Sequence, residues 1–182
     1  MSEEQILILV DDNDREIGTA PRSEAHRGAG KRHRAFVVLL INKKGEVLLQ
    51  HRKNVKLGGD RWDGSAISHV LVGENYSSAA RRSIKNELGI DFFGAFIDCG
   101  AFIYEEHYEN DSENEYCKVL VGEWDGKFTA NTLEMYEAKF VPLKHIIADM
   151  KKDKPHVKYT KWFHLAMEKF LQHPASGKFL KE

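Results

Sequence analysis

The 182-residue chain has few cysteines, few prolines and no long apolar run. Its two cysteines, Cys99 and Cys117, are too few for a disulfide framework, so we expect reduced thiols. No stretch approaches the roughly 20 apolar residues of a membrane helix. The acidic start Met-Ser-Glu-Glu-Gln lacks the basic segment of a secretory signal. These absences predict a cytoplasmic protein that does not insert into a membrane.

The chain also lacks an excess of charge of either sign. Its 27 basic residues nearly balance 28 acidic ones, so net charge indicates no surface for nucleic acid. Hydrophobic residues make up 42% of the chain, which is typical of a globular domain. A chain of this length has room for a single domain, 1–182, whose core we expect at about 5–172. We expect the tail at 174–182 to be frayed.

The hydrophobic pattern predicts strands before and after one well-defined helix. Short apolar or alternating stretches are typical of strands at 5–10, 15–19, 35–41, 46–50, 96–104, 116–124 and 139–142. From Ser77 to Leu88 apolar residues recur at helical spacing, with Ser77 placed to cap the start and Gly89 to end the helix. A second helix is expected at 159–172. This order predicts an α/β fold with a mixed sheet sandwiched between helices.

The central helix and the loop before it carry the most specific motif. The pattern runs Gly, five residues, Glu, seven residues, Arg-Glu, an apolar residue, any residue, Glu-Glu, any residue, Gly and an apolar residue. Residues 68–90 match it at Glu74, Arg82, Ile84, Glu87, Gly89 and Ile90. This loop-helix-loop resembles the Nudix box, which holds a divalent metal against a diphosphate. Ser68, Ser83 and Asn86 depart from the pattern.

The departures at positions 83 and 86 remove carboxylates. Positions 83, 86 and 87 lie on one turn of the predicted helix and in the box form the cluster that neutralises Mg²⁺. Here only Glu87 remains. Hydrolysis of a diphosphate needs metal both to polarise the phosphoryl group and to activate water. The sequence is therefore under-equipped for Nudix hydrolysis.

Outside the box, from about Val10 to Trp162, the chain is similar to the type 1 isopentenyl-diphosphate isomerases. The similarity rests on the segments 15–19, 24–26, 33–36, 62–74 and 113–115. It implies a Nudix fold and one divalent transition metal, Mn²⁺, Zn²⁺ or Fe²⁺, bound by His26, His33, His69, Glu113 and Glu115. Three imidazoles with two carboxylates suit such an ion better than Mg²⁺ alone. Both carboxylates share one side of a strand that begins at or before Glu113.

The same resemblance implies a site for a small-molecule diphosphate substrate. It assigns Mg²⁺ binding to Glu87, closure of a hydrocarbon pocket to Trp162, and diphosphate contacts to Arg22, Arg52, Lys56 and Lys85. Taken alone, each charge is more often solvated, and Trp162 is as often ordinary helix core. Together they match the need of a diphosphate for cations as well as metal.

One catalytic position is vacated. Isomerisation moves a double bond by adding a proton to one carbon and removing one from another. The resemblance assigns this work to Glu115, to Tyr104 beside it, and to a cysteine two residues before His69. Ile67 occupies that last position and cannot transfer a proton, a contribution typically worth about 10²–10⁴-fold in rate. Cys117 shares a strand face with Glu115, and we interpret it as a structural thiol.

Three functions therefore remain open. The first is an isopentenyl-diphosphate isomerase-like enzyme acting on a prenyl diphosphate. The second is a Nudix hydrolase of a nucleoside or prenyl diphosphate, which the box supports and Ser83 and Asn86 oppose. The third is a non-catalytic diphosphate-binding protein, which Ile67 permits. We favour the first, because the histidine and glutamate set, Tyr104 and Trp162 have no evident joint purpose otherwise.

Overall fold

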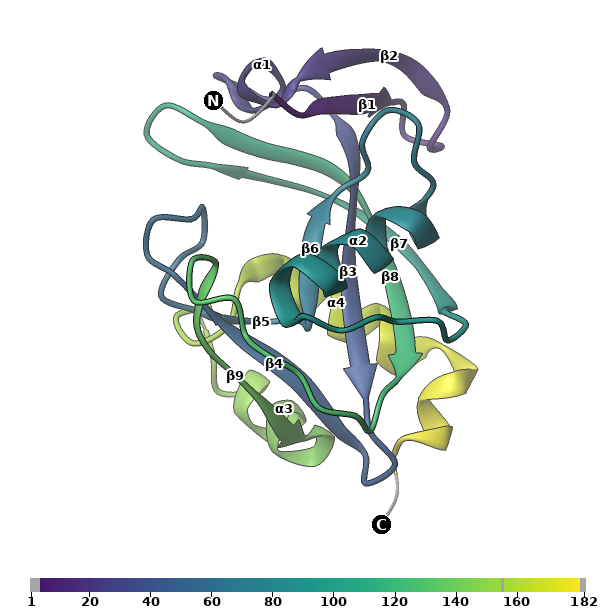
Figure 1. The fold of residues 1–182 in the computed structure, drawn as a ribbon. Coiled ribbons are helices and arrows are strands. Elements are labelled where there is room, and N and C mark those ends of the chain that lie inside the picture. The colour runs from purple at the N-terminus through teal and green to yellow at the C-terminus, as the bar shows by residue number, and fades with distance from the viewer. Residues whose placement is uncertain (1–3, 155, 181–182) are drawn as a thin grey trace.

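A nine-stranded mixed sheet forms the centre of the computed structural model, which describes residues 4–154 and 156–180 (Figure 1). The strands are β1 (Ile6–Val10), β2 (Glu16–Pro21), β3 (His33–Ile41), β4 (Glu46–Arg52), β5 (Trp62–Asp63), β6 (Ala66–His69), β7 (Ile97–His107), β8 (Ser112–Glu123) and β9 (Met135–Pro142). The helices are α1 (Arg22–His26), α2 (Tyr76–Leu88), α3 (Leu143–Met150), α4 (Lys161–Gln172) and the 3₁₀ helix η1 (Pro174–Lys178). No helix of the described residues is long and apolar enough to cross a membrane.

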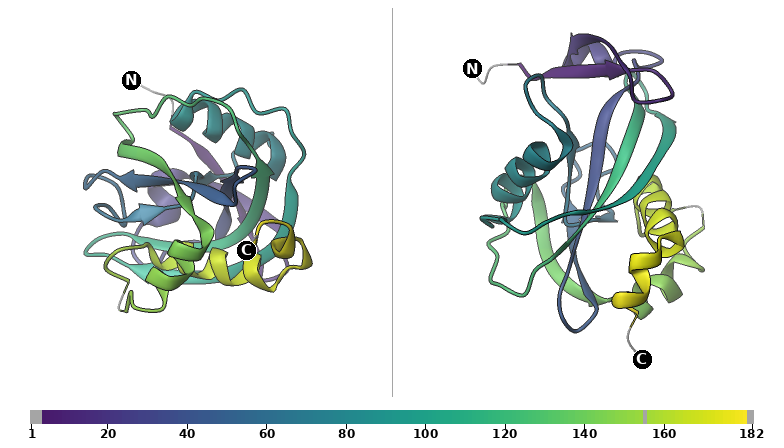
Figure 2. Two further views of the ribbon diagram at one scale, coloured as in Figure 1. Left: turned by 90° about the horizontal axis from the view of Figure 1, so that it is seen from below. Right: turned by 90° about the vertical axis from the view of Figure 1, so that its right-hand side faces the viewer.

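The longest apolar run, β3, forms the middle of the sheet. It pairs in parallel with β8 and antiparallel with β6, and its two ends contact β1 and β4. Phe36 and Val38 belong to the same core cluster as Ile84 of α2, whereas Val37 belongs to the cluster of Phe163 in α4. Figure 2 shows α2 on one face of the sheet and α3 and α4 on the other. Because β3 is covered on both faces, its sequence is a continuous apolar run.

Helix α2 begins and ends at local signals. Asn75 caps its start: the Asn75 side chain accepts a hydrogen bond from the Ser78 backbone at 2.9 Å, and the Ser78 hydroxyl accepts one from the Asn75 backbone. The cap is thus Asn75 and not Ser77, because the reciprocal pair satisfies two otherwise unpaired N–H groups. Gly89 ends the helix in the left-handed conformation, at φ 65°, as predicted.

The predicted strands and both predicted helices are present, with shifted ends, and the predicted Nudix-type layered fold is confirmed. The expectation of a frayed tail is wrong for residues 174–180. Residues 174–178 form η1, and Phe179 packs on Phe170 of α4 with its side chain buried. Burial of this ring holds the tail against the core. Residues 181 and 182 lie outside the described part of the chain.

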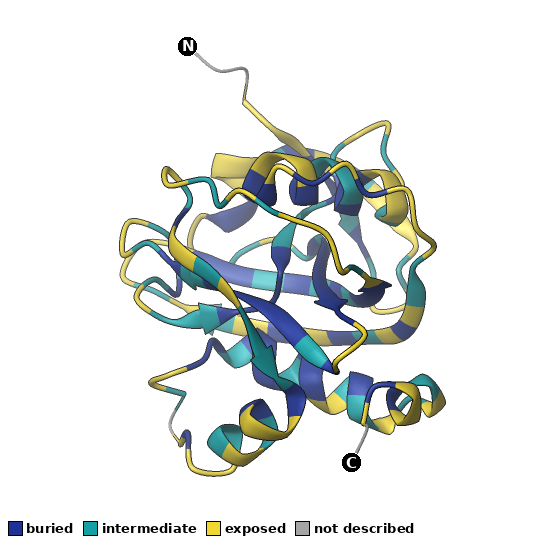
Figure 3. Cartoon of the chain, turned by 60° about the horizontal axis from the view of Figure 1, so that its bottom comes forward, coloured by how far each residue is buried: buried dark blue, intermediate teal, exposed yellow. Residues whose placement is uncertain are grey.

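Burial follows the layers, with β3 and β4 dark at the centre and the outer sides of the helices exposed (Figure 3). Four ionisable residues among the buried polar ones come from three separate elements, α1, β3 and β8. They are His26, His33, Glu113 and Glu115, each less than a tenth exposed. Burying charged groups is costly unless they are paired or bind an ion, so these residues indicate a site.

Candidate metal centre and diphosphate cavity

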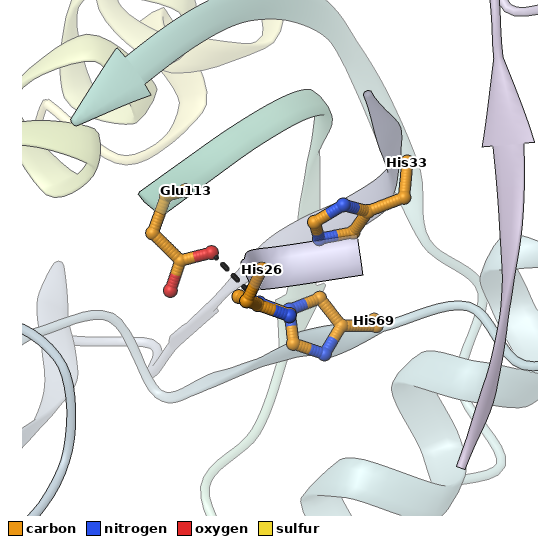
Figure 4. A group of neighbouring side chains, drawn as sticks. All are labelled: His26, His33, His69 and Glu113. Carbon is orange, nitrogen blue, oxygen red and sulfur yellow. Dashed lines mark ion pairs between the residues drawn. The ribbon is translucent and has the colours of Figure 1, made fainter. Parts of the chain in front are cut away.

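Three histidines converge from three elements (Figure 4). His26 ends α1, His33 begins β3 and His69 ends β6. The ring centroids of His26 and His33 lie 4.8 Å apart, those of His26 and His69 5.0 Å, and those of His33 and His69 4.8 Å. Pairing of β6 with β3 and the position of α1 thus bring together residues that are up to 43 positions apart in sequence.

Two carboxylates of β8 complete the set, which we call the metal centre: His26, His33, His69, Glu113 and Glu115. Glu113 Oε2 lies 3.1 Å from His26 Nε2, and Glu115 Oε1 lies 3.2 Å from His69 Nε2 and 3.7 Å from His33 Nε2. β8 begins at Ser112, so both carboxylates point to the same side of the sheet. The parallel register places Glu115 directly beside His33.

The hydrogen bonds of the imidazoles test whether these residues fit a metal. His26 Nδ1 lies 2.8 Å from the carbonyl oxygen of Arg22, and His33 Nδ1 lies 2.8 Å from that of Lys31. A carbonyl accepts, so each Nδ1 carries the proton and each Nε2 presents a lone pair to the centre. Both Nε2 atoms and Glu113 Oε2 are buried without a hydrogen-bond partner. Atoms left so cost about 1–3 kcal/mol each, and a divalent ion would satisfy them.

The donor set agrees with a transition metal. One ligand atom from each of His26, His33, His69 and Glu113 lies within 4.8 Å of the others. Neutral imidazole nitrogens and carboxylate oxygens are the usual ligands of Zn²⁺, Mn²⁺ and Fe²⁺. The arrangement therefore fits one divalent transition metal, and the ligand chemistry alone does not select among these ions.

Burial and mutual charge govern protonation at the centre. Burial lowers the pKa of His69 to about 3, against the opposing effect of Glu115, so the ring is neutral and its lone pair is available. Burial raises the pKa of Glu113, and the charge of Glu115 raises it further. Burial acts in the same direction on Glu115, but the adjacent imidazoles of His33 and His69 outweigh it and hold the Glu115 pKa well below its usual range.

The metal centre lies in the wall of a cavity of about 930 Å³. His26, His69, Glu113 and Glu115 line it, and so do five cationic side chains: Arg22, Arg27, Arg52, Lys56 and Arg82. Lys56 also pairs with Glu134. Such a cavity suits a ligand that carries several negative oxygens.

A buried carboxylate positions two of the predicted substrate residues. Asp63 is fully buried; its Oδ2 accepts from Trp162 Nε1 at 2.6 Å and from Arg52 Nη1 at 3.3 Å. The Arg52 guanidinium lies 5.2 Å from the centre of the Trp162 ring, within range for a cation–π contact. Sequence reasoning missed Asp63, although an acidic residue next to Trp62 in a segment otherwise rich in small and apolar residues is a usable signal.

Glu87 lines the cavity, but its carboxylate is already engaged. Its Oε2 accepts from Gln50 Nε2 at 2.7 Å, and the Ser83 hydroxyl donates to Oε1. Burial raises the pKa of Glu87, with Lys56 opposing this. Ser83 and Asn86 also line the cavity without adding a carboxylate. Glu87 is therefore the one carboxylate that α2 brings to the cavity wall, which is a sparse protein ligand set for the expected Mg²⁺, since Mg²⁺ is bound through carboxylates and substrate phosphates.

Lys85 is not part of the cavity, contrary to the expectation that it contacts the diphosphate. Its side chain is exposed and pairs with Asp91 at 2.7 Å. The reason is helical geometry: each residue of α2 turns about 100°, so Lys85 lies nearly opposite the side that Ser83 and Glu87 share. The structure does bring Arg22, Arg52, Lys56 and Trp162 to the cavity.

The predicted proton-transfer residues lie next to each other. Tyr104 and Glu115 are directly opposed on β7 and β8, and both line the cavity. Burial raises the pKa of Tyr104, and Glu115 raises it further, so the phenol keeps its proton. Ile67 lines the cavity from β6, on the other side of β3 from β8. Cys117 is fully buried in the core beside Ala35 and does not line the cavity, as a structural thiol would be.

Comparison with known proteins shows the family to which this fold belongs. The NUDIX domain family model matches residues 31–163. The chain is 35% identical over 162 residues to isopentenyl-diphosphate Delta-isomerase 2 of Photorhabdus laumondii, covering 88% of this chain and 89% of that one. It is 32% identical over 176 residues to isopentenyl-diphosphate Delta-isomerase of Haloarcula marismortui, covering 91% and 90%.

Solved structures agree at the level of the fold. DR0079 from Deinococcus radiodurans superposes with a TM-score of 0.70 at 20% identity, covering 90% of this chain and 98% of that one. The MutT protein from Methanosarcina mazei superposes with a TM-score of 0.60 at 19% identity, covering 75% and 91%. The chain belongs to the Nudix superfamily. Within it, the chain is a member of the isopentenyl-diphosphate isomerase-like proteins.

Proposed function

We propose that this protein is a metal-dependent enzyme that acts on isopentenyl or dimethylallyl diphosphate. The observation that carries the proposal is the buried metal centre, which has two unpartnered ring nitrogens and lies in the wall of a cavity that cationic side chains help to line. The names of the relatives supply the substrate class, because they are isopentenyl-diphosphate isomerases.

In this proposal the two ends of the substrate contact different walls. Arg22, Arg52 and Lys56 bind the diphosphate, where charge-assisted hydrogen bonds are about twice as strong as neutral ones. The hydrocarbon end contacts Trp162 and Ile67, which line the same cavity. Because Asp63 fixes both Arg52 and Trp162, the two walls keep a constant separation.

Proton transfer in this proposal falls to Glu115 and Tyr104. The ionised Glu115 carboxylate accepts the proton that leaves one carbon, and the Tyr104 phenol stays protonated and donates a hydrogen bond. The proton added to the other carbon comes from a solvent water, which recovers a proton from Glu115. A divalent ion at the metal centre would supply fixed positive charge that keeps the carboxylates ionised and in place. Ile67 offers no titratable atom on its side of the cavity. We therefore expect isomerisation slower than that of a cysteine-containing relative, by about 10²–10⁴-fold.

Two other functions are weaker candidates. Hydrolysis of a diphosphate is opposed by Ser83 and Asn86, which replace carboxylates and leave Glu87 as the one acidic residue of α2 at the cavity. A purely binding role is favoured only by Ile67. Both alternatives use the same cavity, so one experiment separates all three.

The test is incubation of metal-loaded protein with isopentenyl diphosphate in heavy water, followed by proton NMR and a phosphate assay. Deuterium entering the substrate, and loss of this exchange in Glu115→Gln, is the expected result. Glu123→Gln at the far end of β8 is the matched control and should retain exchange. Release of phosphate or pyrophosphate without exchange identifies a hydrolase. Binding with neither reaction leaves a diphosphate-binding protein.

A further inference from the structure

A second cluster of potential metal ligands lies away from the cavity. It consists of Asp153, just after α3, His156 in the following loop and His164 in α4. One ligand atom from each lies within 4.8 Å of the other two. None of these three residues lines the cavity.

Two of the three residues are explained by ordinary hydrogen bonds. Asp153 accepts from the backbone N–H groups of Lys158 and Tyr159, each at 2.8 Å, which fixes the loop before α4. His164 Nε2 lies 2.9 Å from Asp153 Oδ2, a contact that fits a hydrogen bond. A loop anchor of this kind needs no metal.

The third residue has no such explanation. The Nδ1 atom of His156 is buried without a hydrogen-bond partner. The His156 ring nevertheless lies only 4.2 Å from the His164 ring, centre to centre. Its backbone adopts a left-handed conformation at φ 65°, which costs a residue other than glycine about 1–2 kcal/mol. The loop thus holds an unpartnered nitrogen against a histidine and an aspartate in spite of local strain.

We propose that Asp153, His156 and His164 bind a second divalent transition metal, with Zn²⁺ as the best match. Two imidazoles and one carboxylate are a common protein ligand set for Zn²⁺, which then completes its coordination with water. To bind through Nε2, His164 carries its proton on Nδ1, the other neutral tautomer. Asp153 retains its bonds to the loop, because a carboxylate has about four lone-pair positions.

The position of the cluster gives the second ion a role at the cavity. His164 lies two residues from Trp162 in α4, and Trp162 lines the cavity wall. An ion bound by Asp153 and His156 of the loop and by His164 of α4 links the loop to the first turn of α4. It stiffens the segment that presents Trp162, without contacting the substrate itself.

The experiment uses untagged protein stripped with a chelator and titrated with Zn²⁺ by calorimetry. The background variant replaces all three histidines of the metal centre, His26→Ala, His33→Ala and His69→Ala, so that the remaining ion reports the second site alone. In that background His156→Asn is the test variant, because asparagine tolerates the left-handed conformation. His145→Ala is the matched control, since His145 is an exposed histidine of α3.

The expected result is one ion per chain for the background variant and for the background variant with His145→Ala. The background variant with His156→Asn should bind Zn²⁺ more than about tenfold more weakly, since losing even a hydrogen-bond partner of a ligand costs about 10–100-fold. Zn²⁺ should also slow hydrogen exchange at 156–164 in the background variant. No ion in the background variant, or an unchanged affinity on adding His156→Asn, overturns the proposal. Either failure leaves the function proposed for the main cavity untouched.

Discussion

Replacing Asp63 by asparagine should change how the stability of the protein depends on pH. Asp63 is fully buried, and burial raises its pKa from 3.8 to about 6, with Arg52 opposing the rise. Asparagine has nearly the same shape and can still accept from Trp162 Nε1, but it does not titrate. The substitution therefore isolates the charge of one buried group.

The sign and size follow from the shift. A raised carboxyl pKa means that the folded state binds the proton more tightly than the unfolded state, so the wild-type loses stability as the pH rises from about 4 to above 6. One pKa unit corresponds to about 1.36 kcal/mol, so the loss attributable to Asp63 is about 3 kcal/mol. Asp63→Asn should lack this loss, on top of a pH-independent difference between the amide and the protonated carboxyl, because the effect of Arg52 is already part of the pKa.

The measurement is urea unfolding of both proteins, metal-free, at several pH values between 4 and 8. The difference between the two free energies of unfolding removes the contributions of other titrating groups, such as those of the metal centre. That difference should shift in favour of the variant by about 3 kcal/mol across this range. Parallel curves for the two proteins would refute the reasoning, because Asp63 would then titrate in the fold as it does in the unfolded chain.

Three further predictions test the cavity and the tail. Ile67→Cys should raise isopentenyl-diphosphate isomerase activity and recover a substantial part of the roughly 10²–10⁴-fold rate expected for one proton carrier. Proton NMR in heavy water measures this activity, and no gain despite confirmed substrate binding counts against the isomerase proposal. Lys56→Met should weaken calorimetric binding of dimethylallyl diphosphate by about tenfold or more, while Lys85→Met leaves it unchanged; equal losses would return Lys85 to the site. Phe179→Ala should lower the free energy of unfolding by about 3–5 kcal/mol, the usual cost of emptying a buried aromatic position, whereas a frayed tail predicts almost no change in urea unfolding.

The metal centre shows how much of a site the sequence alone predicts. The family resemblance predicts its five residues, and the structure brings all of them together. Spacing alone explains only part of this, since Glu113 and Glu115 share a face through the period of two of a strand. The approach of His26 depends on α1 lying beside the sheet, which no local pattern reveals. Whether these residues fit a metal ion depends on their burial and their unpartnered atoms, which are properties of the packed chain.

Local sequence is enough to predict the elements that follow a short period, namely the apolar run of β3, the α2 helix from its polar cap to Gly89, and the alternation along β8. Contacts between distant residues emerge only in the packed chain: Asp63 holds Arg52 and Trp162, and Phe179 returns the tail to the core. The two kinds of feature differ in the sequence separation over which their interactions act. Periodicity and capping act within a few residues, whereas these contacts join positions such as 63 and 162 that are distant in sequence and meet only when the sheet and helices pack.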